Sequence, residues 1–169
     1  HWISRNLMAY LKMAAGDRTR KLFLEIMNRP NRYIARDALT QTTISFSALR
    51  DFYKDKDWMC DRITTLETHL RILSTLAPYA AVNFIRKGMG YEQYLIEYAQ
   101  YRKIRPEELL EVLDRIQESA KGMKNLEEWE NYIEDYTKKL AEQAKKQETK
   151  REGIVISTLH AVKGLEYDK

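Results

Sequence analysis

Glycine and proline are scarce in this sequence, and that scarcity favours helices over other regular structure. The 169 residues include six glycines and three prolines, so long stretches contain neither of the residues that a helix interior tolerates least. A chain of this length can bury one medium-sized core. The sequence therefore predicts a mainly α-helical globular protein.

Hydrophobic residues recur at the spacing of one helix face through most of the chain. Gly16, Pro30 and Pro78 end the first three stripes, and Pro106 followed by two glutamates is a typical helix start. The stripes contain, in chain order, Ile3, Leu7, Leu11 and Ala14; Leu22 and Ile26; Ile63, Leu66, Leu70, Leu73 and Ala77; Leu109, Leu113, Ile116 and Ala120; Leu126, Trp129, Ile133, Tyr136, Leu140 and Ala144.

The pattern changes near residue 152. The segment "GIVIST" is short, β-branched and opened by glycine, which predicts a buried strand. Because one strand cannot form a sheet, its partners are expected in a missing part of a longer chain or in another chain.

The cysteine content and the hydropathy limit the classes of protein. Cys60 is the only cysteine, which excludes a disulfide framework and favours a reducing compartment; it is either a catalytic nucleophile or, more simply, an incidental thiol. No apolar run is long enough to span a membrane, and the first residues lack the apolar core of a signal peptide. A cytoplasmic protein is expected.

Positive charge is concentrated at the start of the chain. Residues 1–40 contain eight Lys or Arg and three acids, whereas residues 102–148 contain ten Lys or Arg and twelve acids. A basic face attracts nucleic-acid phosphates, although a solvated helix face explains the same pattern.

The last residues carry the most distinctive chemistry. The sequence "ISTLHAVKGLEYDK" places a hydroxyl, an imidazole and an acid after the predicted strand, where α/β sheets bind ligands. Such groups can bind a phosphate backbone and a ribose, or they can simply form a strand-to-helix connection.

This ending resembles motif V of the UvrD/PcrA/Rep-like superfamily 1 DNA helicases, whose pattern is roughly T-x-H-x-x-K-G-L-E-aromatic. The resemblance implies that Thr158, His160 and Lys163 face single-stranded DNA. It also implies that Glu166 bonds the ribose of ATP, with Gly164 beside it at the nucleotide.

The rest of the chain resembles this family more weakly, in the same order. "HWISRNLMAYLKMAAG" is similar to a helix of the RecA-like domain 2A, and "FLEIMNRPNRYIARDAL" and "GYEQYLIEYA" are similar to parts of the inserted 2B domain. The resemblance implies a 2A helix at 1–16, a helical 2B domain at 17–151, and a 2A strand with motif V at 152–169. The chain is thus expected to be a piece of a larger helicase.

One departure concerns the duplex-binding turn of the family, which usually reads Gly-Ile-Gly after P-x-R. Here the residues are Tyr33, Ile34 and Ala35, and their side chains would hinder the approach of a DNA phosphate to the backbone. The nearby Arg29, Arg32 and Arg36 are predicted either to contact DNA phosphates or to be plain surface charge, so the grip on duplex is altered or lost.

No G-x-x-x-x-G-K-[ST] stretch occurs in the sequence, so the loop that cradles nucleotide phosphates is missing. The resemblance implies that ATP and Mg²⁺ bind in the parent protein, that this piece alone binds neither, and that it does not hydrolyse ATP. No metal site is predicted. The expected partners are single-stranded DNA, duplex or junction DNA, and the remaining helicase domains 1A, 1B and 2A.

Tyrosines also recur at helical spacing, at positions 91, 94, 98 and 101. They are expected to be half-buried packing residues more often than base-stacking ones, and His69 is expected to be packed or exposed, not a metal ligand. Two functions therefore compete. The chain is either the regulatory, duplex-orienting part of an ATP-dependent DNA helicase, or a helical protein-interaction module without a role in unwinding.

Overall fold

The computed structural model describes the backbone of residues 1–159 and the side chains of residues 1–152. The chain divides into two compact units, His1–Trp129 and Glu130–Lys169, and each is described by itself. The regular structure of the described residues is helical, as predicted, and a single isolated β-bridge is found among them. No helix in this part of the chain combines the length and the apolar character needed to cross a membrane.

The elements are α1 (Trp2–Ala14), α2 (Arg20–Ile26), the 3₁₀ helix η1 (Arg36–Ala38), α3 (Phe46–Phe52), α4 (Asp57–Leu73), α5 (Pro78–Asn83), the π-helical segment η2 (Phe84–Gly88), α6 (Tyr91–Arg102), α7 (Pro106–Ser119) and α8 (Leu126–Leu159).

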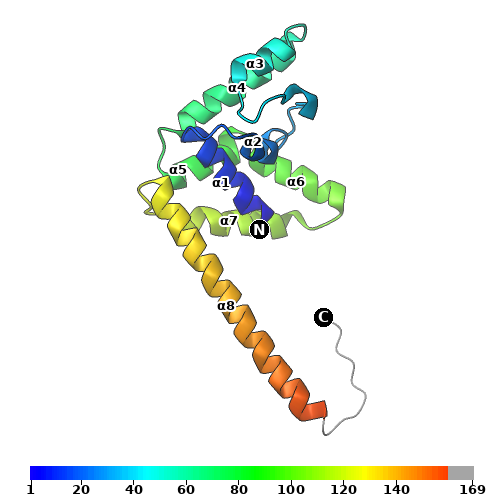
Figure 1. Cartoon of the computed structure of the whole chain (residues 1–169), viewed down its shortest axis with the longest axis vertical. Coiled ribbons are helices and arrows are strands. Elements are labelled where there is room, and N and C mark those ends of the chain that lie inside the picture. The colour runs from blue at the N-terminus through cyan, green and yellow to red at the C-terminus, as the bar shows by residue number, and fades with distance from the viewer. Residues whose placement is uncertain (160–169) are drawn as a thin grey trace. The chain divides into compact units, whose positions relative to one another are not determined.

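Helix α1 forms the centre of the first unit (Figure 1). It packs against α2, α4 and α7, and its Ile3, Leu7 and Met13 are completely buried. The helix ends as predicted at Gly16, whose φ of 113° is accessible mainly to glycine. The resemblance assigned 1–16 to a different domain from the residues that follow. In this structure α1 shares one core with them, and which domain it would join in a longer protein stays a prediction.

Helices α3 and α4 pack against each other at one end of the unit. The Ser45 hydroxyl caps α3 by accepting from the Ala48 amide. Helix α4 buries the predicted stripe from Ile63 to Leu73, whereas Ala77, the last predicted member, lies after the helix and is exposed. A bridge between Thr19 and Thr43 joins the start of α2 to the segment before α3, with two hydrogen bonds of 2.7 and 2.8 Å. The segment between these two threonines, which includes α2, is therefore closed by the bridge.

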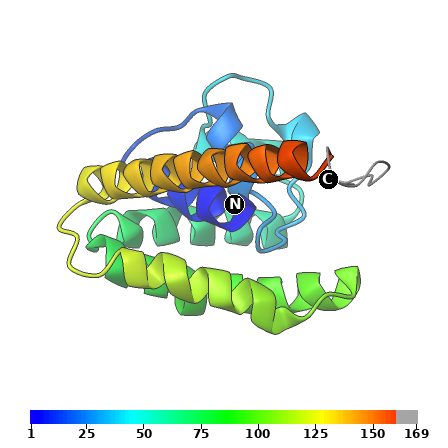
Figure 2. The same ribbon diagram turned by 90° about the horizontal axis from the view of Figure 1, so that it is seen from below.

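Helices α6 and α7 lie side by side and are joined by a short turn (Figures 1 and 2). Arg86 connects η2 to both helices. Its guanidinium pairs with Glu92 of α6, and it also lies 2.6 Å from the Asp114 carboxylate and donates to Gln117 at 2.9 Å, both on α7. Burial opposes ionisation of Glu92, but hydrogen bonds from Arg86 and Lys87 outweigh it and lower the pKa of Glu92.

Helix α8 begins at Leu126, after Asn125 accepts a hydrogen bond from the Glu128 amide at 2.9 Å. Trp129, its last residue in the first unit, is buried and donates to the Ser119 hydroxyl. The backbone remains helical through Leu159, so the structure does not confirm the strand predicted from residue 152. A strand needs a partner to satisfy its amides and carbonyls, whereas a helix satisfies them within itself.

Candidate nucleic-acid interface

The loop between α2 and η1 contains Arg29 and Arg32, and Arg36 begins η1 directly after it. The Asn28 side chain holds this loop closed. Asn28 Nδ2 donates to the Ile34 carbonyl at 2.9 Å, and Asn28 Oδ1 accepts from the amides of Ile34 and Arg32 at 3.0 and 3.3 Å. One side chain in the first half of the loop thus bonds to two residues of its second half. The loop conformation is therefore fixed by internal hydrogen bonds.

Arg32 points into the protein and is only 9% exposed. Its Nη1 atom donates to the carbonyls of Ile26, Met27 and Pro30 at 2.8 to 3.3 Å, and its Nη2 atom donates to the Tyr10 hydroxyl at 2.9 Å. A guanidinium that is buried and turned toward backbone carbonyls is poorly accessible to a DNA phosphate. Arg32 therefore stabilises the loop, which argues against the phosphate contact predicted for it.

Tyr10 completes this internal arrangement. Burial raises the pKa of the Tyr10 phenol, and the charge and hydrogen bond of Arg32 only partly offset that effect. The hydroxyl therefore stays protonated, and it donates to the Arg29 carbonyl at 2.7 Å while accepting from Arg32. This pairing could not be predicted from sequence spacing, because Tyr10 and Arg32 lie on different elements.

The turn that replaces Gly-Ile-Gly offers no free backbone amide to a phosphate. The Tyr33 amide donates to Asn31 Oδ1 at 2.9 Å, the Ile34 amide donates to Asn28, and the Ala35 amide donates to the Tyr53 hydroxyl at 2.8 Å. Tyr33 also has a φ of 59°, in the left-handed region that favours glycine. The backbone amides of this turn are therefore not available to bind a phosphate.

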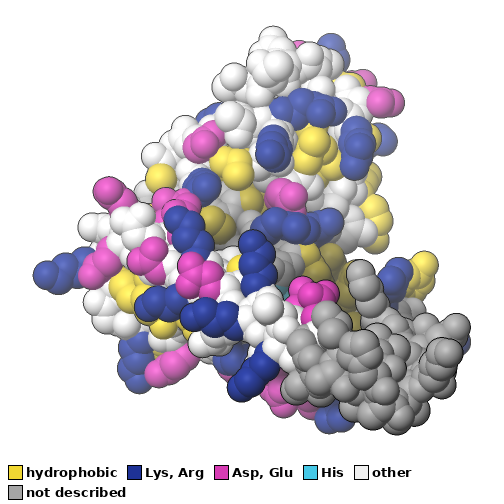
Figure 3. All heavy atoms as spheres, turned by 60° about the horizontal axis from the view of Figure 1, so that its bottom comes forward, with side chains coloured by type: hydrophobic (Ala, Val, Ile, Leu, Met, Phe, Trp, Pro, Cys, Tyr) yellow, Lys and Arg dark blue, Asp and Glu magenta, His cyan; other side chains and the backbone are white. Residues whose placement is uncertain are grey.

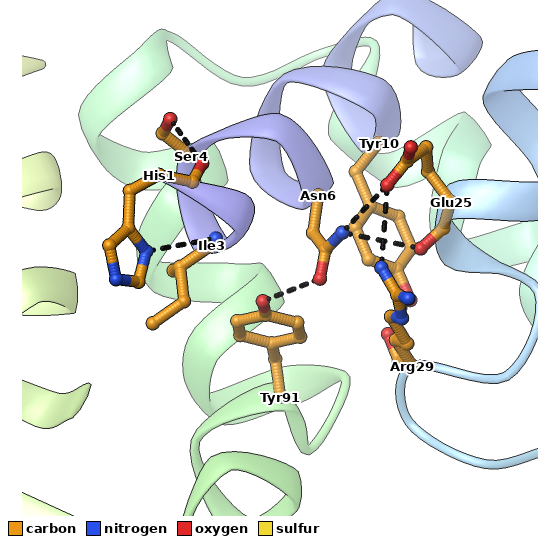
Figure 4. Close-up of polar contacts among 8 residues, drawn as sticks. All are labelled: His1, Ile3, Ser4, Asn6, Tyr10, Glu25, Arg29 and Tyr91. Carbon is orange, nitrogen blue, oxygen red and sulfur yellow. Dashed lines mark hydrogen bonds and ion pairs between the residues drawn. The ribbon is translucent and has the colours of Figure 1, made fainter.

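Arg29 and Arg36 remain as candidate phosphate contacts, in different environments. Arg36 is exposed on η1. The Arg29 guanidinium lies 3.3 Å from Glu25, whose other partner is the Asn6 amide, and Figure 4 shows Asn6 between Glu25 and Tyr91. Glu25 partly neutralises Arg29, so Arg36 is the stronger candidate.

A cluster of two exposed rings and one cation, which was not predicted from the sequence, lies beside the loop. The Arg62 guanidinium lies 4.9 Å from the centroid of the Trp58 ring and 5.2 Å from that of Tyr33. We call Tyr33, Trp58 and Arg62 the Arg62 cluster. The i, i+4 spacing of Trp58 and Arg62 was the available signal, but the contribution of Tyr33 from the loop was not predictable from spacing.

Charges around this cluster are mixed. Basic and acidic side chains occur together over the face shown in Figure 3, next to hydrophobic side chains. The exposed residues that flank the cluster in sequence are Arg36, Lys54 and Lys56 on the basic side, and Asp37, Asp55, Asp57 and Asp61 on the acidic side. These three basic and four acidic side chains nearly cancel in charge, so short-range contacts are expected to decide what binds.

The tyrosines of α6 behave mainly as packing residues. Tyr91 is buried, Tyr94 and Tyr98 are half-buried, and only Tyr101 projects into solvent, at 84% exposure. Tyr98 also packs against Trp2, with ring centroids 5.1 Å apart. His69 is half-buried against the Phe84 ring, and the Cys60 thiol lies within 3.4 Å of two backbone carbonyls.

The motif V positions are largely outside the described residues. Thr158 lies in the helical backbone of α8 without a described side chain, and His160, Lys163, Gly164 and Glu166 follow the last described residue. Their predicted contacts with DNA and ATP stay predictions. No group of three or more potential metal ligands occurs in the described part of the chain.

Comparison of the chain with protein-family models, curated proteins and solved structures returns no match in any of the three. The interface is therefore interpreted from its own geometry and from the sequence.

Proposed function

We propose that this chain is part of an ATP-dependent DNA helicase of the UvrD/PcrA/Rep-like superfamily 1, in which it supplies the regulatory, duplex-orienting 2B domain and part of the DNA/ATP coupling motif. The motif V pattern carries this proposal, because seven positions match within ten residues: Thr158, His160, Lys163, Gly164, Leu165, Glu166 and Tyr167. The helical fold supports it at the level of fold class.

In this proposal the chemistry takes place in the intact parent protein. ATP and Mg²⁺ bind with the help of domains 1A, 1B and the rest of 2A, and Glu166 and Gly164 contact the nucleotide. Thr158, His160 and Lys163 contact the single strand. Because these residues are adjacent in the chain, a movement at one ligand is transmitted to the other.

Duplex or junction DNA is proposed to contact the α2–η1 loop through Arg36 and, more weakly, Arg29. The buried Arg32 has no part in this contact. With its backbone amides occupied, the loop offers side-chain charge alone, so duplex binding should be weak and sensitive to salt.

The test is the steady-state ATPase activity of the full-length protein, with and without single-stranded DNA. Glu166→Ala should weaken ATP binding by roughly 1.5 to 3 kcal/mol, as expected for a hydrogen bond to a charged group. His160→Ala should chiefly reduce the stimulation by single-stranded DNA. Asp168→Ala is the matched control, since this acid lies outside the motif pattern.

Distinct defects in the two variants would support the coupling role. If Glu166→Ala left the Michaelis constant for ATP unchanged and His160→Ala left DNA stimulation intact, the motif V assignment would be wrong.

The alternative is a helical protein-interaction module, and one observation favours it. Described by itself, α8 exposes Tyr132, Tyr136 and Leu140 along one side, with the two tyrosine rings stacked 6.4 Å apart. Exposed aromatic side chains at helical spacing are typical of a surface that binds a partner helix. Absence of DNA binding by the chain even at low salt would favour this alternative.

A further inference from the structure

The Arg62 cluster exposes two aromatic rings next to the loop that the proposed function assigns to DNA. Trp58 is 51% exposed and Tyr33 is 66% exposed, which is unusual for side chains of this size. Both rings already have the Arg62 guanidinium nearby, at 4.9 and 5.2 Å from their centroids. Large areas of both rings nevertheless remain accessible to a ligand.

The cluster is ordered by the protein in advance of any ligand. Arg62 Nη1 lies within 3.4 Å of the Arg32 carbonyl, its acceptor, in addition to its contacts with the two rings. The Tyr33 backbone is fixed by its amide hydrogen bond to Asn31 and by the closed loop. Because these side chains have already lost much of their freedom, a ligand that stacks on them loses less conformational entropy in binding.

We propose that the Arg62 cluster binds an unpaired base of single-stranded DNA by stacking, with Arg62 close to the adjoining phosphate. This inference rests on the proposed DNA-binding function and specifies the form of DNA that the loop region contacts. Bases stack on aromatic rings and on guanidinium planes without requiring a particular sequence.

The chemistry of the surroundings favours an unpaired base over a duplex. The backbone amides of the Tyr33–Ile34–Ala35 turn are occupied, so they cannot cradle the phosphates of a duplex. The acidic and basic residues that flank the cluster in sequence are nearly equal in number. Long-range attraction to a dense array of phosphates is therefore expected to be weak. In a base pair the π faces are covered by neighbouring pairs, whereas an unpaired base can present its face to Trp58 or Tyr33.

The same geometry disfavours a cationic ligand. Aromatic clusters can hold quaternary ammonium or methylated lysine groups, but here Arg62 already places a positive charge beside both rings. A second cation would be repelled. An anionic ligand with a flat π face, such as a nucleotide, matches both the charge and the rings.

The experiment compares three fluorescein-labelled probes by anisotropy with the full chain at low salt. The probes are a short oligodeoxythymidylate, an abasic phosphodiester oligomer of equal length, and a fully paired hairpin with the same number of phosphates. The thymidylate should bind roughly 5- to 100-fold more tightly than the abasic oligomer, which is the fold-change that one stacked base provides. Its salt slope should reflect about one phosphate contact, near −0.7.

Variants separate the cluster from the rest of the surface. Trp58→Ala should remove most of the preference for thymidylate over the abasic oligomer, and Tyr33→Gly should reduce it without introducing backbone strain. Tyr101→Ala is the matched control, because Tyr101 is a more exposed aromatic on α6, outside the cluster. The control should bind all three probes like the unmodified chain.

Equal binding of thymidylate and abasic oligomer, or full retention of the preference in Trp58→Ala and Tyr33→Gly together, would overturn the inference. If the hairpin still bound with an Arg36-dependent salt slope, the proposed DNA-binding function would survive that result. If the chain bound none of the probes, both the inference and the DNA contact would be wrong.

Discussion

The Tyr91 hydroxyl donates a 2.9 Å hydrogen bond to the Asn6 side-chain oxygen, and both side chains are fully buried. This bond joins α6 to α1. The Asn6 side-chain amide in turn donates to the Glu25 carboxylate of α2 at 3.2 Å. Burial raises the pKa of Tyr91, so its hydroxyl remains a donor at neutral pH. A chain of polar contacts thus crosses the apolar core.

Tyr91→Phe and Asn6→Leu should each lower the free energy of unfolding by about 1 to 3 kcal/mol, because each leaves a buried partner without its hydrogen bond. The double variant should lose less than the sum of the two single variants, since both removals abolish the same bond. Urea denaturation of all four proteins measures this coupling. Strict additivity would show that the bond contributes nothing to stability.

Arg32 and Arg36 should have opposite roles despite their proximity in the sequence. Arg32→Met should cost at least about 2 kcal/mol of unfolding free energy, because it leaves buried carbonyls and the Tyr10 hydroxyl without a donor. Arg36→Ala should leave stability within about 0.5 kcal/mol, but it should reduce the slope of log affinity for duplex DNA against log salt by about 0.9. Denaturation and salt titration of each variant test the pair; a stable Arg32→Met variant with a flattened salt slope would reverse the assignment.

Tyr33 pays a conformational cost for its left-handed backbone. Replacement by glycine removes that strain of about 1 to 2 kcal/mol but adds freedom to the unfolded chain, and it loses the contact with Arg62. Tyr33→Gly should therefore change the unfolding free energy by less than about 1 kcal/mol. Tyr33→Val, which is β-branched, should destabilise the protein by more than Tyr33→Gly. Thermal and urea denaturation of both variants check the order, and equal stabilities would contradict the left-handed assignment.

His69 should make stability depend on pH. Burial, followed by the positive charge of Arg32, lowers the pKa of His69 below its ordinary value. Its contribution to stability is therefore fully present above the unfolded-state pKa of about 6.5 and is lost as pH falls below that value and through the lower folded-state pKa. His69→Gln should flatten the decrease in unfolding free energy that occurs as the pH falls below about 6.5. Thr68→Gln, at an exposed position next to His69 on α4, is the control and should leave the decrease unchanged.

The longer helices could be predicted from sequence because they have apolar stripes and local start or stop signals. The stripe from Ile63 to Leu73 became the buried face of α4, and Pro106 with its two glutamates begins α7. Pro78 begins α5 directly after the stripe that it was expected to end. These features depend on residues only a few positions apart, so they can be recognised from the spacing of residues in the sequence.

The interface was less predictable, because it depends on contacts between distant elements. Arg32 looks like its two arginine neighbours in the sequence, and only the packing of Tyr10 and the loop carbonyls around it shows that it is internal. The segment after residue 152 has strand-forming residues, yet a strand's pairing partners cannot be read from one segment. Local propensity alone did not decide its conformation.

The hydrogen bonds of Asn28, Arg32 and Tyr53 give the α2–η1 loop its shape before any partner arrives. Docking on this loop would therefore order no new backbone. Calorimetry of such an encounter should show a small heat-capacity change, unlike the large negative value that accompanies folding upon binding. A partner would bind a rigid surface, because the conformational entropy of the loop is already lost when the chain folds.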